Sequence, residues 1–451
     1  MIFRTILVIV VGAATLHSQE PDAGTFTFRE GGGRLLSVML EAANDTIAMT
    51  WPDAVDSGWD TALLGVRVVA DFQGAAPFIE IASGGKSDRQ YLRPGETGPR
   101  WLNLSFLRGA MSGGTGLSLR TQGVRITAGN APLRLFANGL DLSRRLLVLA
   151  PHPDDAEIAA YGVYAHRNAT IVTITSGNAG PRSYETVFDD VAAMYHFKGR
   201  IRLIDSITVP WLGGIPPERA FNMGYFDARL AEMYGKPTAV VPEMYGPNTD
   251  IGAYLKYNLG SLLPKRSRAS TWANLVDDLE TVLKKVNPAV ILAPHPQLDS
   301  HADHQFATVA LNEALSRRRR RVTLLLYTNH ADRNRYPYGP AGTVMSLPPV
   351  AQDVQLDRVY SHPVPADLQR EKLFALEAMH DLRPSPARIY QLEIGADRSN
   401  VPENLGSSAF GGVNYLRRGP RSNELFFVYD QATVTPIIEA FLADWKARAT
   451  P

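Results

Sequence analysis

Two short segments of the chain carry a dense set of side chains that can bind a metal ion. The first reads Leu-Ala-Pro-His-Pro-Asp-Asp and ends at Asp155. The second reads Leu-Ala-Pro-His-Pro and is followed by His301, Asp303 and His304. His152, Asp155 and His304 offer two imidazole nitrogens and one carboxylate oxygen. Three such ligands with a position left for water are typical of a catalytic zinc site.

A metal held there would provide the nucleophile for a hydrolysis, because the pKa of a bound water falls from about 15.7 to about 7. Asp154 is the candidate general base, since at a tight strand-to-helix turn its carboxylate and that of Asp155 can diverge. One would point to the water and the other to the metal. A protonated His301 can stabilise the developing oxyanion, with Asp303 or Asp299 holding its imidazole oriented and charged.

A lone histidine in such a segment is more often a satisfied core or surface residue. The joint occurrence argues otherwise, because three of the ten histidines and four carboxylates directly follow two strand-like segments. His295 is the exception. It matches His152 in position, but His301 and His304 already account for that part of the site, so we predict that His295 either supports a ligand from behind or has a structural role.

The segments before these side chains have the pattern of buried parallel strands. Leu146–Leu149 is a continuous apolar run, followed by a helical pattern over Ala156–His166 and a β-branched run over Thr170–Thr175. This is the plan of a β-α-β unit. A second unit repeats it with a strand at Val290–Leu292, a helix at His304–Leu315 and a strand at Val322–Tyr327. Open α/β sheets bind ligands at the carboxyl ends of their strands, so both metal-binding segments are expected to meet at that edge.

The rest of the region 141–450 supplies further expected elements. We predict helices over Phe188–Phe197, over the segment 271–286, over Ala366–Met379 and over Thr433–Ala447, and strands at Arg202–Val209 and Glu424–Tyr429. Pro210–Pro264 is dense in Gly, Pro, Tyr and Met, which indicates an insertion with short helices near the mouth of the site. Asn400–Asn423 is rich in loop-forming residues.

Residues 25–140 have a different pattern, in which short β-rich runs alternate with Gly, Asp and Pro clusters. This is typical of an all-β, sandwich-like domain, and the short connection 141–145 suggests that it packs closely on the α/β region. Trp51 and Trp59 lie near predicted turns and could bind sugar rings. The interpretation that we favour is that they fill the core.

Composition excludes several classes of protein. A hydrophobic fraction of 45% and a charged fraction of 20% are those of a globular chain, and a net charge of +1 gives nucleic-acid binding no electrostatic support. The arginine run Arg317–Arg321 is interpreted as a solvated helix end.

Arg4 and the apolar run Ile6–Ala14 predict a signal peptide over residues 1–18. The mature protein would then be secreted or periplasmic with no stable membrane span, and a membrane anchor is the alternative.

Pro151–Glu157, which reads Pro-His-Pro-Asp-Asp-Ala-Glu, and Asp299–His304, which reads Asp-Ser-His-Ala-Asp-His, resemble the paired motifs of the LmbE-like, or PIG-L, deacetylases. The resemblance implies a Rossmann-like, mostly parallel sheet with helices on both faces, and the removal of an acyl group, commonly acetyl, from the nitrogen of a glucosamine-type sugar. The metal would be Zn²⁺, or another divalent ion such as Fe²⁺.

The resemblance also implies a role for each residue. His152, Asp155 and His304 correspond to metal ligands, Asp154 to the general base, and His301 to the group that stabilises the oxyanion. Asp303 corresponds to the residue that orients the oxyanion-stabilising histidine. The substrate would be a small molecule or glycan that carries an N-acyl amine.

The same residues are compatible with two other functions. His152-Pro153-Asp154 with a distant histidine also fits the facial triad of a non-heme Fe(II) oxygenase. That motif is expected in a jelly roll, and it leaves Asp155 without a role. A secreted carbohydrate-binding protein with a relic metal site would lack a ligand or a base, and the sequence lacks neither.

Overall fold

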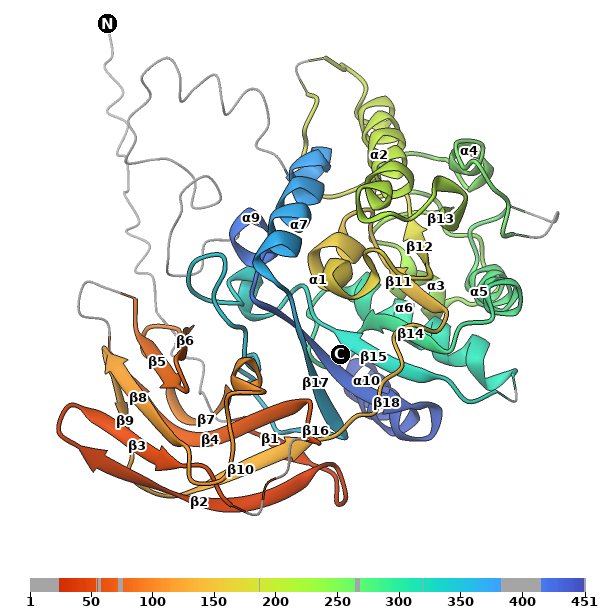
Figure 1. Cartoon of the computed structure of the whole chain (residues 1–451). Coiled ribbons are helices and arrows are strands. Elements are labelled where there is room, and N and C mark those ends of the chain that lie inside the picture. The colour runs from red at the N-terminus through yellow and green to blue at the C-terminus, as the bar shows by residue number, and fades with distance from the viewer. Residues whose placement is uncertain are drawn as a thin grey trace, which may run out of the picture.

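The computed structural model describes residues 24–382 except 54, 56, 57, 72–75, 186, 264–267 and 319, together with residues 415–449. Two large sheets organise this part of the chain, as Figure 1 shows. A two-stranded sheet of β1 (Phe26–Phe28) and β16 (Val354–Leu356) lies beside them. The predicted signal peptide, residues 1–18, lies outside the described residues.

The first large sheet is antiparallel and has nine strands, which confirms the β-rich prediction for this region. Eight strands follow the order β6-β5-β8-β3-β2-β10-β4-β7, and β9 pairs with β4. Side chains from β2, β4, β5, β8 and β10 share one hydrophobic core, so the sheet curls around its own interior. The bounds are β2 Arg34–Ala43, β3 Thr46–Thr50, β4 Thr61–Ala70, β5 Phe78–Ser83, β6 Lys86–Tyr91, β7 Thr97–Asn103, β8 Gly116–Gln122, β9 Val124–Ile126 and β10 Gly129–Phe136, with a short helix η1 at Ser105–Leu107.

Trp51 and Trp59 belong to this core. They are 1% and 4% exposed, and their rings lie 5.5 Å apart. The core-filling interpretation is confirmed, because neither ring presents a face to solvent that could stack on a sugar.

The second large sheet has seven strands in the order β13-β12-β11-β14-β15-β18-β17. Strands β11 to β15 are parallel to one another, and the edge pair β18 and β17 is antiparallel. The bounds are β11 Leu146–Ala150, β12 Ala169–Thr175, β13 Ala220–Tyr225, β14 Val290–Pro294, β15 Thr323–Tyr327, β17 Arg358–Pro363 and β18 Asn423–Asp430. The chain moves outward from β11 to β13 and then returns to β14 on the other side. β11 and β14 therefore flank the switch point, where such sheets bind ligands.

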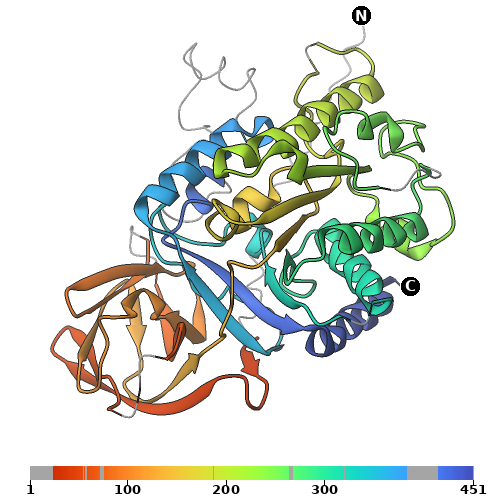
Figure 2. The same ribbon diagram turned by 45° about the vertical axis from the view of Figure 1, so that its right-hand side comes forward.

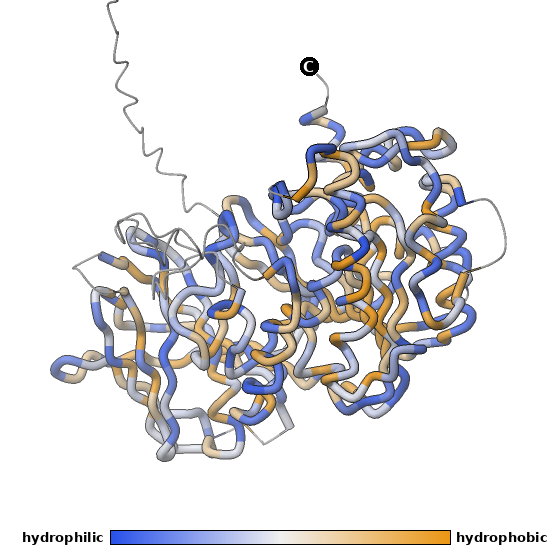
Figure 3. Tube along the Cα trace, turned by 90° about the horizontal axis from the view of Figure 1, so that it is seen from above, coloured by the Kyte–Doolittle hydropathy of each residue, from blue (hydrophilic) through white to orange (hydrophobic). Residues whose placement is uncertain are grey.

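Helices cover both faces of this sheet, as predicted. Leu147 and Leu149 point into a core shared with α2, α5, α6 and α10, whereas Leu146 and Val148 point into a core shared with α1 and α7. Figure 3 shows hydrophobic residues concentrated inside this region. The bounds are α1 Asp155–Tyr164, α2 Val191–Thr208, α3 Leu230–Gly235, α4 Gly252–Leu255, α5 Trp272–Val286, α6 Ala302–Ser316, α7 Ala366–Ala378, α9 Tyr415–Arg418 and α10 Gln431–Ala449, with short helices η2 Val209–Gly213, η3 Pro217–Arg219, η4 Asp332–Asn334 and η5 His380–Leu382.

The predicted strand Arg202–Val209 is wrong, since most of it is the end of α2. The short apolar pattern of this segment fits both the two-residue period of a strand and the 3.6-residue period of a helix. Leu203 and Ile207, which are four residues apart, are both buried, as expected for one face of a helix. The third parallel strand is instead β13, which lies inside the segment read as an insertion. No strand was predicted there, because Pro and Gly residues surround it.

The two large sheets are in direct contact, as the short connection 141–145 suggests. The side chain of Asn103 donates to the carbonyl oxygen of Met345 and to the hydroxyl of Ser361, both at 2.9 Å. The side chain of Asn138 donates to the carbonyl oxygen of Val359 at 2.9 Å. β1, predicted as part of the N-terminal sheet, pairs with β16 instead. Among the described helices, none is both long and apolar enough to cross a bilayer.

Candidate metal centre and active site

The two metal-binding segments meet at the carboxyl edge of the parallel sheet. The first turns from β11 into α1, and the amide of His152 donates to Asp155 Oδ2 at 2.8 Å. This closes the turn and brings both side chains to one side. The second enters α6, for which His301 is the N-cap residue, so His304 lies in the first turn of that helix.

The three predicted ligand atoms converge. His152 Nδ1 lies 3.1 Å from His304 Nε2 and 3.3 Å from Asp155 Oδ2. His304 Nε2 lies 3.0 Å from Asp155 Oδ2. Ligand atoms about 2.0–2.1 Å from a tetrahedral zinc ion stand about 3.3 Å apart, so this triangle fits one face of such a site.

A second layer of hydrogen bonds orients these ligands. Asp299 Oδ2 lies 3.0 Å from His304 Nδ1 and accepts from the amide of Asn329 at 2.8 Å. The side chain of Asn329 donates to Asp155 Oδ1 at 2.8 Å, which leaves Oδ2 to face the two histidines. A carboxylate behind a ligand histidine and an amide behind a ligand carboxylate are the usual outer partners of a metal site.

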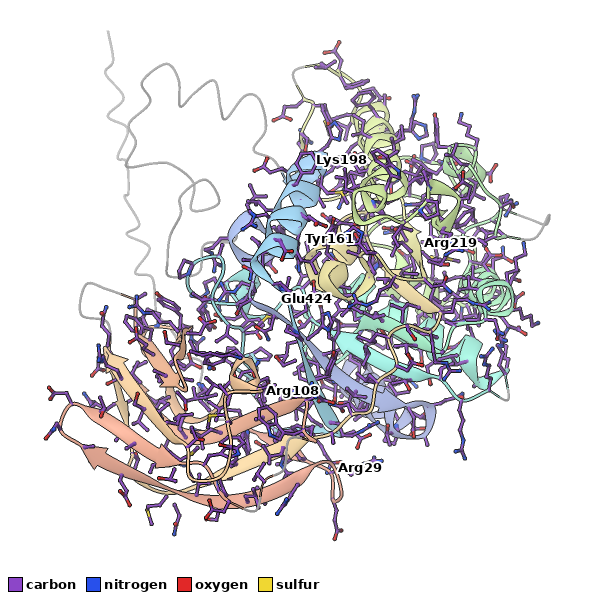
Figure 4. All side chains as sticks on the ribbon, viewed as in Figure 1. Arg29, Arg108, Tyr161, Lys198, Arg219 and Glu424 are labelled. Carbon is purple, nitrogen blue, oxygen red and sulfur yellow. The ribbon has the colours of Figure 1, made fainter. Side chains whose placement is uncertain are left out.

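Asp154 is held apart from the ligands. Its Oδ2 accepts from Arg202 Nη2 at 3.2 Å, and burial raises the pKa of its carboxyl group while Arg202 acts in the opposite direction. Arg202 also lies 3.4 Å from Asp381, to which Lys198 adds an ion pair at 3.1 Å. Lys198, labelled in Figure 4, lies one turn before Arg202 on α2. Sequence reasoning missed Arg202 because its segment was predicted to be a strand.

Burial of His301 acts against the protonated state that the sequence predicts for it. Burial lowers the pKa of its imidazole to about 3, which favours the neutral ring. His301 Nδ1 accepts from the amide of Asp303 at 3.2 Å, which assigns the ring proton to Nε2. A neutral imidazole with Nε2–H is still a hydrogen-bond donor, so the ring can polarise a carbonyl without a full charge.

Asp303 also has different partners from those predicted. Its carboxylate accepts from the amides of Ala228 at 2.6 Å and Leu230 at 3.1 Å, and its Oδ2 lies 3.4 Å from His152 Nε2. It therefore contacts His152 and the loop after β13, whereas only its backbone contacts the His301 ring. Residues two apart at a helix start point to different faces, which explains why the two side chains do not meet.

Comparison with known families agrees with this geometry. Residues 147–315 match the family model described as PIG-L, GlcNAc-PI de-N-acetylase. These residues form a PIG-L domain. The chain thus contains a de-N-acetylase domain with a buried His and Asp cluster that can hold a metal ion.

No curated protein matches the chain. Among solved structures, a 4-carboxy-2-hydroxymuconate hydratase from Pseudomonas putida is 12% identical, with 64% of this chain and 95% of that chain covered and a TM-score of 0.29. A xylanase 10B fragment with CBM22-1 and GH10 modules from Clostridium thermocellum is 11% identical, with 65% and 79% covered and a TM-score of 0.18.

Asp227 is a member of the buried cluster in the PIG-L domain that was not predicted from the sequence. It follows β13, and its Oδ1 lies 3.1 Å from His152 Nε2. Burial alone would raise the pKa of Asp227, but His152 and Arg202 hold it low. The rule that places ligands after parallel strands would have found Asp227 if β13 had been recognised.

His330 and Tyr415 complete the surroundings of the PIG-L cluster. The His330 ring lies 4.6 Å from that of His304, and Tyr415 Oη lies 3.5 Å from His330 Nδ1. Within the described part of the chain, three further groups bring ligand atoms within 4.8 Å of one another. They are His152 with His301 and His304, Asp155 with His304 and His330, and His152 with Asp227 and Asp303.

His295 lies away from the cluster. It is buried, its Nε2 lies 3.1 Å from the hydroxyl of Tyr429, and its Nδ1 accepts from the amide of Gln297 at 3.2 Å. These contacts fix the end of β14 against β18, which is a structural role.

Proposed function

We propose that the protein is an exported, zinc-dependent N-deacetylase that removes an acetyl group from an amino-sugar substrate. The observation that carries the proposal is the triangle of His152 Nδ1, Asp155 Oδ2 and His304 Nε2, with edges of 3.0 to 3.3 Å and Asp154 directly beside it in the chain. The name of the matching family supports an N-acetyl substrate on a glucosamine-type sugar.

His152, Asp155 and His304 would hold the metal. Two nitrogens and one oxygen suit Zn²⁺, and Fe²⁺ can also bind such a set. When bound, the ion lowers the pKa of a water and polarises the acyl carbonyl.

Asp154 accepts the proton from the attacking water, whose oxygen bonds to the acyl carbon. Arg202 holds this carboxylate in place through its hydrogen bond of 3.2 Å. His301 Nε2–H donates to the carbonyl oxygen as negative charge develops on it. Asp154 then returns the proton to the sugar nitrogen as the carbon–nitrogen bond breaks, which yields acetate and a free amine.

The oxygenase alternative receives no support from the fold, because its motif would open a helix after a parallel strand rather than lie in a jelly roll.

Export of the protein is supported by Arg4 and the apolar run Ile6–Ala14, which have the pattern of a signal peptide.

The experiment that tests the proposal is a screen for acetate release over N-acetylated mono- and oligosaccharides with zinc-loaded protein. Release by the natural chain and its loss in Asp154→Ala would support the proposal. Turnover that requires oxygen and a 2-oxo acid would contradict it, as would purified protein that takes up no divalent ion under any loading condition.

A further inference from the structure

A groove runs along α10 beside the PIG-L cluster. Figure 2 shows α10 next to α6, and the two helices are in contact. A cavity of about 590 Å³ lies between α10, the loop 296–300 and the loop 349–354. A second cavity of about 220 Å³ lies further along α10. Both are lined by Gln297 and Ala440, so they form one elongated groove, which we call the α10 groove.

The inner end of the α10 groove borders the proposed metal site. Asp299 and His330 line it, and these are the residues that lie against the far side of His304. The outer end is lined by Arg29, which is labelled in Figure 4, together with Asp353 and Asp357. The α10 groove thus leads from the back of the metal cluster toward the two-stranded sheet.

Uncharged amide side chains are frequent in the α10 groove. Four glutamines line it, namely Gln297, Gln305, Gln352 and Gln355. A side-chain amide offers both donors and an acceptor, which suits hydroxyl groups that also donate and accept. The amide nitrogen of Gln305 already donates to the carbonyl oxygen of Asp299 at 2.8 Å. One wall is aromatic, with Trp445 and Phe441 from α10. Trp445 packs on Phe306 at 5.2 Å between ring centroids and is only partly buried, so part of its ring is available to a ligand.

The charged residues of the α10 groove are of both signs. Arg93 pairs with Asp332 at 3.3 Å, and Arg448 pairs with Asp444. Arg29 shares the outer end with two carboxylates. Without a surplus of positive charge, the α10 groove does not favour a phosphate or another anion.

We propose that the α10 groove binds an uncharged, linear glycan chain. Its elongated shape fits a polymer better than a single ring, its amides match sugar hydroxyls, and its aromatic wall can pack on the apolar face of a sugar. The glycan held there would be separate from the reacting sugar of the proposed function, because Asp299 and His304 lie between the α10 groove and the proposed metal position.

The test measures binding of chitotetraose, the tetramer of N-acetylglucosamine, to the full-length protein by calorimetry. The double variant Gln352→Ala with Gln355→Ala removes two exposed amides from the α10 groove and is expected to weaken binding at least about tenfold. Gln122→Ala, which changes an exposed glutamine on β8 of the other sheet, is the matched control and should bind as the natural chain does.

His304→Ala separates the α10 groove from the metal site. Chitotetraose binding that survives in His304→Ala supports the glycan groove, whereas its complete loss there assigns the binding to the metal cluster and overturns it. Three other results would also overturn the glycan-binding proposal. They are no binding of chitotetraose to the natural chain, unchanged binding by the double variant, and equal affinity of the natural chain for a blocked neutral tetrapeptide. Acetate release is measured separately, so a protein that binds chitotetraose but deacetylates nothing contradicts only the proposed function.

Discussion

The Nε2 atom of His304 lies 3.0 Å from the Oδ2 atom of Asp155, although the two residues belong to different β-α units. Each residue is local to the start of its own helix, and only the pairing of β11 with β14 brings the two helix starts together. The proposed metal site is therefore a property of the strand order.

Removal of the general base should separate catalysis from metal binding. Asp154→Asn keeps the size of the side chain and leaves His152, Asp155 and His304 intact, so zinc content should stay unchanged. Deacetylation should fall by about 10²–10⁴-fold, which is the usual contribution of a general acid–base group. Metal analysis and acetate release on the same preparation test this, with His304→Ala as the variant that should lose zinc. Full activity in Asp154→Asn would remove Asp154 from the mechanism.

Asn329 should tune the metal affinity without being a ligand. Asn329→Ala removes the donor that holds Asp155 Oδ1 at 2.8 Å, and the loss of such an outer partner typically weakens metal binding about 10–100-fold. Titration against a chelator of known affinity measures the change. Arg219→Ala, at an exposed residue labelled in Figure 4 that bonds to Asn168, is the control and should bind zinc normally.

A buried ion pair should stabilise the contact between α7 and β18. Lys372 donates to Glu424 at 2.7 Å, and Glu424, labelled in Figure 4, also accepts from the amides of Gly162 and Val163 in α1. Lys372→Met leaves a buried carboxylate without its cation, which should lower the free energy of unfolding by about 3–5 kcal/mol.

Denaturant unfolding measures that change. The matched control is Lys284→Met, which breaks the more exposed pair of Lys284 and Glu280 and should cost at most about 1 kcal/mol. Equal effects of the two substitutions would contradict the stabilising role of the buried pair.

His295 should make the fold sensitive to acid. Burial lowers the pKa of its imidazole from 6.5 to about 3, although Asp299 acts in the opposite direction. The unfolded chain therefore binds the proton first, so the contribution of His295 to stability is complete above about pH 6.5 and is lost as the pH falls toward about 3. The loss can reach about 1.4 kcal/mol for each pH unit.

His295→Asn should reduce this pH dependence, because an amide oxygen can replace Nδ1 as acceptor for Gln297 and does not titrate. Unfolding of the natural chain and the variant in the presence of a chelator, at about pH 7, 6 and 5, gives the comparison. Parallel stability curves for the two proteins would show that the His295 imidazole does not control the acid sensitivity.

Features that depend only on neighbouring residues could be predicted from the sequence. The apolar run Leu146–Leu149 and the polar turn after it predicted a buried strand that ends in metal-binding groups, and the repeat at Val290 predicted a second one. Strand period and turn chemistry are local properties, so these predictions needed no knowledge of packing.

Tertiary structure decided which other residues join the cluster and what state they adopt. Arg202 reaches Asp154 only because its segment is helical, and Asp227 reaches His152 only because β13 pairs with β12. The lowered pKa of the His301 imidazole follows from its burial, which no local pattern records. Burial, charge and strand order are properties of the whole fold, and for that reason the sequence indicated some members of the cluster and not the others.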